Sequence, residues 1–291
     1  MAWNLCSKPL FMKRIKMYSK VYVEITNICN KSCSFCHGHS RKPREMSKEE
    51  FSLILDKLSG QTKYIYYHLM GEPLVHPLLP EFISLAKGCG FKSIVTTNGS
   101  LLNKRACELL SAGVHKFNIS LHSFEDGNDE EHIRYVRELA EFSKAAAAKG
   151  IIVIFRLWNN GLDNGRNENV LSILKESISG EWTKTNRDIR IRDKIHLEYG
   201  ERFEWPDSNA EIKGDSFFCY GLKDHFGILS DGTVVPCCLD SDGIISLGNI
   251  FNEDISAILS SERARAMLEG FKCGRASEEL CKRCGYAQKF I

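Results

Sequence analysis

Short apolar runs alternate with amphipathic segments along the first two thirds of the chain. Runs rich in Val, Ile and Phe between turn residues are typical of buried strands, and apolar residues at spacings of three and four are typical of helices. The predicted strands cover residues 21–25, 64–68, 93–97, 116–120, 151–155 and 194–198. The predicted helices cover residues 47–58, 78–87, 103–112 and 169–178, with a longer helix that ends at residue 148.

The ends of several helices carry specific signals. Ser47 and Glu50 form a capping box at the start of the first helix, and Gly60 follows its end. Asn103 is expected to cap the third helix, and Gly150 marks the end of the long one. Six strand-then-helix alternations with short links indicate a parallel sheet. The fold class is therefore α/β, with the sheet curled into a partial (β/α)6 barrel.

The pattern changes after residue 200 to short strands and loops. Asp231 and Gly232 stand between two short apolar runs, which is a hairpin signal. Such a hairpin presents Cys237 at the end of a strand. We predict three parts, namely an N-terminal extension over 1–20, a barrel over 21–200 and a small α+β domain over 201–291.

Composition narrows the function classes. Of 291 residues, 43% are hydrophobic and 26% are charged, which is typical of a globular protein with a sizeable core. The net charge of +2 gives no general basic footprint for nucleic acid. The N-terminus lacks the features of a signal peptide, and no stretch approaches the ~18 apolar residues of a membrane span. We expect a cytoplasmic protein without a membrane partner.

Twelve cysteines in a chain without a secretory signal point to metal binding rather than to disulfides. Nine of them fall into two groups, at residues 29–36 and 219–284. Cys6, Cys89 and Cys107 stand apart and are predicted to be ordinary thiols.

The first group follows the first strand with the spacing C-x3-C-x2-C, at Cys29, Cys33 and Cys36. Thiolates ligate soft metals and iron–sulfur clusters, and a closed [4Fe–4S] site takes four of them. Three thiolates leave one iron without a protein ligand, and that iron can chelate a substrate. Two alternatives are reactive thiols and a zinc knuckle, for which His37 or His39 would be the fourth ligand.

This spacing, with Phe35 just before the last cysteine, resembles the cluster loop of the radical S-adenosylmethionine (radical SAM) superfamily. The resemblance implies that the open iron binds the amino and carboxylate groups of S-adenosylmethionine (SAM). It also implies that an electron from the cluster cleaves SAM to methionine and a 5′-deoxyadenosyl radical. The electron would come from a donor such as flavodoxin or ferredoxin.

The same resemblance assigns contacts with SAM to the carboxyl ends of the strands, where such folds place functional residues. The segment Met70-Gly71-Glu72-Pro73 resembles the superfamily's Gly-Gly-Glu, with Met in place of the first Gly. Arg156 is expected to pair with the SAM carboxylate, and a structural ion pair is the alternative. No catalytic acid or base is assigned. The cofactor contacts implied are Phe35, Gly71, Glu72, Asn98, Ser120 and Arg156.

The second cysteine group resembles the twitch, or short SPASM, extension of radical SAM enzymes, which holds auxiliary iron–sulfur clusters. Cys238 is expected to be a packing residue, and Cys273 is an alternative ligand. A structural zinc ribbon is the alternative for the whole group. The ligands implied are Cys219, Cys237, Cys281 and Cys284.

Together the two groups resemble the twitch-type dehydrogenase that oxidises an aminocyclitol alcohol. The resemblance implies two [4Fe–4S] clusters per chain, SAM, and a substrate that loses a hydrogen atom and is then oxidised with the auxiliary cluster as electron acceptor. The runner-up is an enzyme that modifies a peptide, so the substrate partner is a small molecule or a peptide. Residues 1–20 are too short for a peptide-binding appendage. A non-catalytic zinc- or cluster-binding module is an alternative of another class.

Overall fold

The computed structural model describes residues 17–125, 127–163, 165–186 and 188–290. Cys6 and the first sixteen residues of the predicted N-terminal extension lie outside these ranges. Among the helices in the described ranges, none has the length and apolar character needed to cross a membrane.

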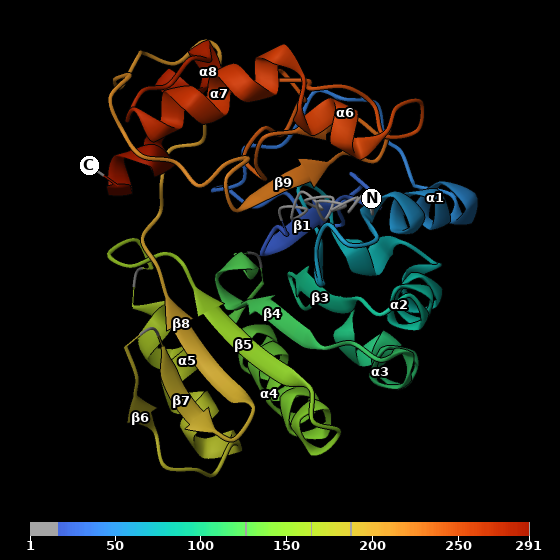
Figure 1. Ribbon diagram of the computed structural model, residues 1–291. Coiled ribbons are helices and arrows are strands. Elements are labelled where there is room, and N and C mark those ends of the chain that lie inside the picture. Colours follow the sequence, from blue (N-terminus) through green and yellow to red (C-terminus); the bar gives the residue numbers. More distant parts are fainter. Residues whose placement is uncertain (1–16, 126, 164, 187, 291) are drawn as a thin grey trace, which may run out of the picture.

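Ten strands form one sheet, which is strongly curved (Figure 1). The strands are β1 (Lys20–Val23), β2 (Tyr64–Tyr67), β3 (Lys92–Thr97), β4 (Lys116–Ser120), β5 (Ile152–Leu157), β6 (Thr183–Lys184), β7 (Ile189–Arg192), β8 (Ile195–Tyr199), β9 (His225–Ile228) and β10 (Val234–Val235). Their order is β10-β9-β1-β2-β3-β4-β5-β8-β7-β6. The seven strands from β9 to β8 are parallel, whereas β10, β7 and β6 run antiparallel to their neighbours.

Helices pack against one face of this sheet (Figure 1). Phe117 of β4, for example, packs edge-on against Phe142 of a long helix at a centroid distance of 5.1 Å. Residues of the same parity on the neighbouring strands, such as Val95 and Val153, are fully buried. The helices are α1 (Lys48–Leu58), η1 (Pro73–Val75), α2 (Leu79–Gly88), α3 (Leu102–Ala112), η2 (Leu121–Ser123), α4 (Asp129–Ala148), α5 (Arg166–Ser177), α6 (Ile255–Leu259), α7 (Glu262–Lys272), α8 (Glu279–Lys282) and η3 (Gly285–Phe290).

The six predicted parallel strands are all present, as are the five predicted helices between them. The capping box is confirmed, because the Ser47 side chain accepts from the Glu50 N–H and the Glu50 side chain accepts from the Ser47 N–H. The predicted cap at Asn103 is wrong. Helix α3 begins at Leu102, where the Leu102 N–H donates to the Gly99 carbonyl in a preceding turn, and its N-cap residue makes no side-chain hydrogen bond.

The C-terminal third of the chain pairs with the barrel sheet in a way that was not predicted. The hairpin at Asp231 and Gly232 is present, since Val234 of β10 pairs with Ile228 of β9. Strand β9 also pairs in parallel with β1, so a segment beyond the predicted boundary at residue 200 extends the barrel sheet. The helices α6 to α8 were not predicted, and neither were β6 and β7. The domain boundary itself stays a prediction.

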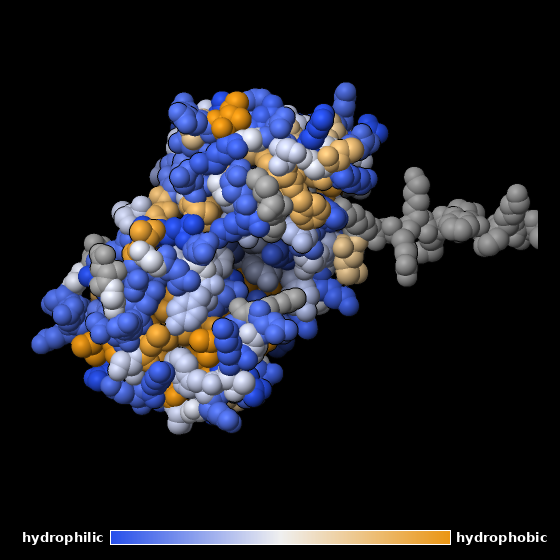
Figure 2. All heavy atoms as spheres, turned by 90° about the vertical axis from the view of Figure 1, so that its left-hand side faces the viewer, coloured by the Kyte–Doolittle hydropathy of each residue, from blue (hydrophilic) through white to orange (hydrophobic). Residues whose placement is uncertain are grey.

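The second face of the sheet, here called the inner face, carries polar residues. Tyr22, Tyr66, Ile94 and Lys116 stand opposite one another on β1 to β4 and therefore point to the same side. Figure 2 shows the left-hand side of Figure 1, where the C-terminal helices lie above β8. It shows a hollow between these two parts, with largely hydrophilic residues around it.

Candidate active site

The N-terminal cysteines lie on the loop that follows β1. Cys29 and Cys36 are exposed and Cys33 is half-buried, and the Cys36 N–H donates to the Cys33 carbonyl at 3.0 Å. Burial is the main reason that the pKa of Cys29 is raised and that of Cys33 reaches about 12, and neighbouring acids and thiols add to it. Metal binding at these thiols would therefore be accompanied by proton release.

The donor set of this loop fits an iron–sulfur cluster, because three sulfur atoms stand on one short irregular segment. Among the residues that the structure describes, no three His, Cys, Asp or Glu side chains form a group suited to a single metal ion. A four-iron cluster is several times wider than an ion, so its cysteines do not have to converge in that way.

Two residues from outside the loop hold it in place. The Glu125 carboxylate accepts from the backbone N–H and from the hydroxyl of Ser34, both at 2.5 Å. The Trp205 indole N–H donates to the carbonyl of Phe35 at 3.2 Å. Sequence analysis did not select Glu125 or Trp205, because neither stands at a strand end or in a motif.

The ring of Phe35 lies between His122 and Arg202. Its centroid is 4.7 Å from that of the His122 imidazole and 5.5 Å from the guanidinium carbon of Arg202. Burial lowers the pKa of His122 to about 4, so the imidazole is neutral at pH 7. The predicted contact residue Phe35 thus belongs to a small group that covers the cysteine loop.

Gly71 and Glu72 form a tight junction with the same loop. A Cβ on Gly71 would lie 2.4 Å from the carbonyl oxygen of Thr26, and its φ is +75°. The Glu72 N–H donates to the Ile28 carbonyl at 2.9 Å, next to Cys29. The Glu72 carboxyl is almost fully buried, and this burial raises its pKa to about 7.

Asn98 and Ser120 stand at the carboxyl ends of β3 and β4, as predicted. The Asn98 amide donates to Asn30 on the cysteine loop at 3.0 Å, and the Asn98 N–H donates to the Glu72 carboxylate at 2.7 Å. Ser120 pairs in register with Arg156. The structure therefore brings the predicted SAM contacts together at one edge of the sheet.

Arg156 on β5 points to the inner face and has a protein partner. Its Nε donates to the Glu198 carboxylate on β8 at 3.0 Å, and its guanidinium carbon lies 4.6 Å from the ring of Trp158. If Arg156 forms a structural ion pair, its partner is therefore Glu198. The predicted contact of Arg156 with SAM stays a prediction.

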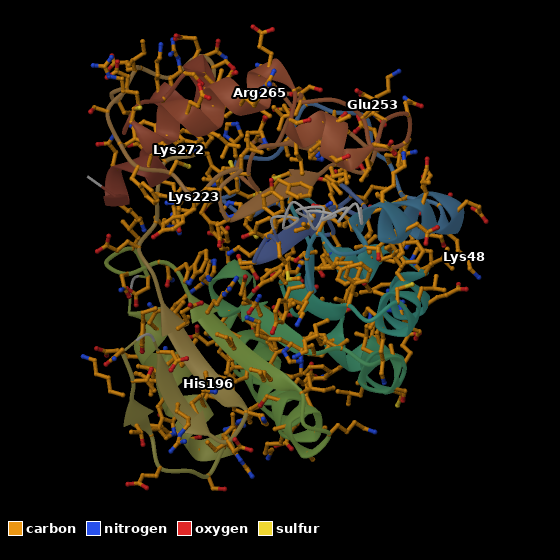
Figure 3. The ribbon with its side chains drawn as sticks, viewed as in Figure 1. Lys48, His196, Lys223, Glu253, Arg265 and Lys272 are labelled. Carbon is orange, nitrogen blue, oxygen red and sulfur yellow. The ribbon has the colours of Figure 1, made fainter. Side chains whose placement is uncertain are left out.

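Other residues of the inner face are aromatic or polar. The Tyr22 ring packs against Tyr66 and edge-on against His68, at centroid distances of 5.4 and 5.2 Å. His196 of β8, labelled in Figure 3, belongs to the same face because it pairs with Ile154, which in turn pairs with Asn118. A face of this kind suits a polar organic molecule.

The C-terminal cysteines form a second group of thiols. The Cys219 sulfur accepts from the Gly221 N–H at 3.3 Å. A Cβ on Gly221 would lie 3.5 Å from that sulfur and 3.8 Å from the Cβ of Cys237. Burial raises the pKa of Cys281, and the nearby Cys219 and Cys284 raise it further. Cys219, Cys237, Cys281 and Cys284 therefore lie together, and four sulfur donors also fit an iron–sulfur cluster.

The two remaining C-terminal cysteines differ from each other in position. Cys238 lies near the same thiols, since in addition to burial it raises the pKa of Cys219 and Cys237. Cys238 turns toward the barrel and shares a side-chain hydrogen bond with Tyr22. It packs with the small apolar cluster of Tyr22, Leu69, Leu229 and Val235, in line with the packing role expected for it. Cys273 is exposed at the C-cap of α7.

Glu24 links the two parts of the chain. It is fully buried and accepts from both terminal nitrogens of Arg41 at 2.7 Å. It also accepts from the backbone N–H and hydroxyl of Ser230, at 3.1 and 3.0 Å, and from the Met70 N–H. The Arg41 Nε donates to the Ser241 carbonyl at 2.8 Å. The cysteine loop and the C-terminal hairpin are thereby fixed to the same carboxylate.

Comparison with known families agrees with this arrangement. Residues 23–169, just over half of the chain, match the model of the radical SAM superfamily, and residues 219–285 match that of an iron–sulfur cluster-binding domain, SPASM. The chain belongs to the radical SAM superfamily and is a radical SAM enzyme with a C-terminal SPASM-type domain. Its cofactors are a [4Fe–4S] cluster and SAM, with additional cluster binding in the SPASM domain.

Individual relatives belong to different functional classes. The chain is 35% identical over 297 residues to a probable GTP 3′,8-cyclase of Sulfolobus acidocaldarius, covering 86% of this chain and 90% of that one. It is 25% identical to the sporulation killing factor maturation protein SkfB of Bacillus subtilis, covering 83% of this chain and 64% of that one.

Solved structures share the fold. BtrN in complex with AdoMet and 2-DOIA superposes with a TM-score of 0.63 at 21% identity, covering 92% of this chain and 93% of that one. SuiB of Streptococcus suis, bound to S-adenosylmethionine, superposes with a TM-score of 0.62 at 14% identity, covering 93% of this chain and 72% of that one. The predicted α/β radical SAM fold is confirmed.

Proposed function

We propose that the protein removes a hydrogen atom from an organic substrate and oxidises that substrate, as a dehydrogenase does. The substrate lies on the inner face of the sheet. Cys29, Cys33 and Cys36 hold the cluster that acts on SAM. The auxiliary cluster has Cys219, Cys237, Cys281 and Cys284 as its ligands.

One observation carries the proposal, namely that four C-terminal thiols lie together. Cys219 is next to Cys237, and the charges of Cys219 and Cys284 both act on Cys281. A cluster with a thiolate on every iron has no position left for a substrate, but it can exchange electrons. Such a site favours oxidation of the substrate over reactions that anchor the substrate to the auxiliary cluster.

When bound, the open cluster and SAM supply the 5′-deoxyadenosyl radical, which is the species that removes the hydrogen atom. The residues of this chain position SAM. Glu72 faces its ammonium group, and the backbone N–H groups of Leu74 and Asn98 hold the carboxylate in place. Arg156 pairs with the SAM carboxylate through its terminal nitrogens. The remaining proposed contacts are Phe35, Gly71, Asn98 and Ser120.

A redox-neutral reaction on a nucleotide is a second candidate, supported by the 35% identity to a probable GTP 3′,8-cyclase over 86% of the chain. Modification of a peptide is a third, supported by similarity to SkfB and to SuiB, which has been solved bound to the precursor peptide SuiA. The mass of the product separates the first two. Oxidation removes two hydrogen atoms from the substrate, whereas a cyclisation without net oxidation leaves its mass unchanged.

The ligand assignment is tested by single Cys→Ala variants of the six C-terminal cysteines, each reconstituted anaerobically and assayed for iron and acid-labile sulfide. Loss of a ligand destabilises a cluster, so variants at 219, 237, 281 and 284 should lose iron. Variants at Cys238 and Cys273 are the matched controls and should retain it. Iron loss in the Cys273 variant, or full retention in one of the four, would contradict the assignment.

The division of roles is tested with the Cys281→Ala/Cys284→Ala double variant. It should still form 5′-deoxyadenosine from SAM and dithionite without substrate, because the N-terminal set is intact. To find the substrate, deuterated metabolites are supplied and deuterium is sought in 5′-deoxyadenosine. With that substrate, the double variant should make little oxidised product. Unchanged product formation would refute the role of the auxiliary site in oxidation.

A further inference from the structure

Two lysines of the inner face converge on one tyrosine ring. Lys20 opens β1 and Lys116 opens β4, so both stand at the amino ends of their strands. The ring centroid of Tyr66 on β2 is 5.6 Å from the Lys20 Nζ and 5.5 Å from the Lys116 Nζ. Both lysines are half-buried.

The carboxylates near this face already have other partners. Glu24 is paired with Arg41, and Glu198 is paired with Arg156. Lys20 and Lys116 form no salt bridge within the ranges that the structure describes. Burial lowers the pKa of Lys116, and repulsion from Arg156 contributes to the same shift. The inner face therefore has an excess of positive charge.

Asp224 precedes His225, which pairs with Lys20, and it too has partners. Asp224 accepts from the Ser19 hydroxyl at 2.6 Å and lies 3.5 Å from the Nδ1 atom of His225. A cation over an aromatic ring gains only about 0.5–1 kcal/mol at an exposed site. Contact with Tyr66 is thus a weak substitute for a counter-ion for either ammonium group.

Two buried polar atoms lie close to these lysines and lack hydrogen-bond partners among the described residues. The Nδ1 atom of His68 and the Oδ1 atom of Asn118 are buried and form no hydrogen bond with the described residues. Asn118 is fully buried. His68 directly follows β2 and packs edge-on against Tyr22 of the inner face, and Asn118 follows Lys116 on the inner face of β4. Buried polar atoms without partners are uncommon and are typical of a place where a ligand binds.

An alternative explanation for the two lysines is that their aliphatic stems cover apolar surface while their ammonium groups reach solvent. Here both ammonium groups lie near the half-buried ring of Tyr66 instead, which argues against it. We propose that Lys20 and Lys116 bind an anionic group of the substrate, a phosphate or a carboxylate, at the amino ends of the strands. The predicted SAM contacts stand at the carboxyl ends, so the two sites are separate. The proposal rests on the proposed function in one respect, that the substrate lies on the inner face.

The test measures anion binding to the reconstituted holoenzyme by anaerobic calorimetry, with inorganic pyrophosphate in one arm and malonate in the other. Saturating SAM is present in both arms, so that neither anion occupies the SAM carboxylate site. The proteins are wild type, K20Q, K116Q, the double variant and K104Q. Lys104 is an exposed residue of α3, so K104Q makes the same charge change away from the inner face.

Binding to wild type should weaken at least tenfold in the double variant and by less in each single variant, with K104Q unchanged. The arm with tighter binding identifies the anion as phosphate or carboxylate. The K20R/K116R variant should keep most of the affinity, which separates lost charge from lost folding. Iron content should be unchanged in every variant, and K104Q should also form 5′-deoxyadenosine without substrate at the wild-type rate.

Two results would overturn the anion site: no measurable binding of either anion to wild type, or equal binding to wild type and to the double variant. Failure of the proposed function has a different signature. In that case wild type would form no 5′-deoxyadenosine from SAM, or no oxidised product from a substrate, whatever its affinity for pyrophosphate and malonate.

Discussion

Arg156 has two contacts that orient its guanidinium at the carboxyl end of β5. Its Nε is held by Glu198, and its guanidinium lies over Trp158. These contacts fix the plane of the guanidinium. The two terminal nitrogens form no hydrogen bond with described residues and keep the fork geometry that suits a carboxylate. An ion pair with Glu198 and a contact with SAM are therefore compatible.

Replacing Arg156 by Ala should weaken SAM binding by well over tenfold, because loss of one partner of a desolvated charge pair costs about 2–5 kcal/mol. Iron content should not change, since Arg156 does not touch the cysteine loop. Glu198→Gln is the matched control. It keeps the guanidinium and should reduce SAM affinity by a smaller factor. Equilibrium dialysis with labelled SAM measures both, and wild-type affinity in the Arg156 variant would remove this residue from the site.

At the scale of elements, the turn between β2 and η1 is tied closely to the cysteine loop. Gly71 adopts a left-handed conformation there and approaches the backbone of Thr26 and Asn27. Any side chain at this position meets rigid backbone atoms rather than a flexible neighbour. The glycine is therefore needed for space as well as for its φ.

Gly71→Ala should lower both the stability of the fold and the iron held by the first cysteine set. Gly60→Ala is the matched control, because Gly60 has a φ of +76° but open space around its Cβ position. Left-handed strain alone costs about 1–2 kcal/mol, which both variants share. Only Gly71→Ala should also lose about half of the iron. Urea unfolding and iron assays measure the two effects, and equal iron in both variants would refute the role of close approach.

The elements were predictable to different degrees. Strands such as β5 and helices such as α4 have long apolar patterns and clear end signals, so their positions followed from the sequence. The pairing of β9 with β1 did not, because alternation within a strand says nothing about which distant strand lies beside it. Strand β6 and helices α6 and α8 are too short for a periodic signal.

At the scale of the whole molecule, two cysteine sets stand on separate parts of the chain that share a buried carboxylate. Glu24 receives hydrogen bonds from Arg41 near the first set and from Ser230 in the hairpin before the second. A buried ion pair with every oxygen satisfied fixes a single arrangement at the expense of desolvation. The relative position of the two cysteine sets is thereby determined by side chains far apart in sequence.

Anaerobic reconstitution should give about eight iron atoms per chain, since two [4Fe–4S] clusters hold four each. The Cys29/Cys33/Cys36→Ala triple variant should keep about half, because the C-terminal set is built from separate elements. Circular dichroism serves as the control for folding. Complete loss of iron from a folded triple variant would show that the second set does not bind a cluster by itself.

The candidate site was predictable where chemistry is local in sequence. Spacing was sufficient to select Cys29, Cys33 and Cys36, and a strand end preceded Arg156. Glu125 and Trp205 were not found, since they hold the loop from positions more than 80 residues away and belong to no motif. The proximity of Lys20 and Lys116 could not be predicted from the sequence either, because it depends on three intervening strand pairings.

The pairing of β1 with β9 has a consequence for synthesis on the ribosome. Strand β1 leaves the exit tunnel first, but its second neighbour begins only at His225. At about 5–20 residues per second, roughly 10–40 s separate the two events. During that time one edge of the nascent sheet has unpaired backbone groups, which other chains can bind. The nascent protein is therefore vulnerable to aggregation until the segment that begins at His225 has been translated.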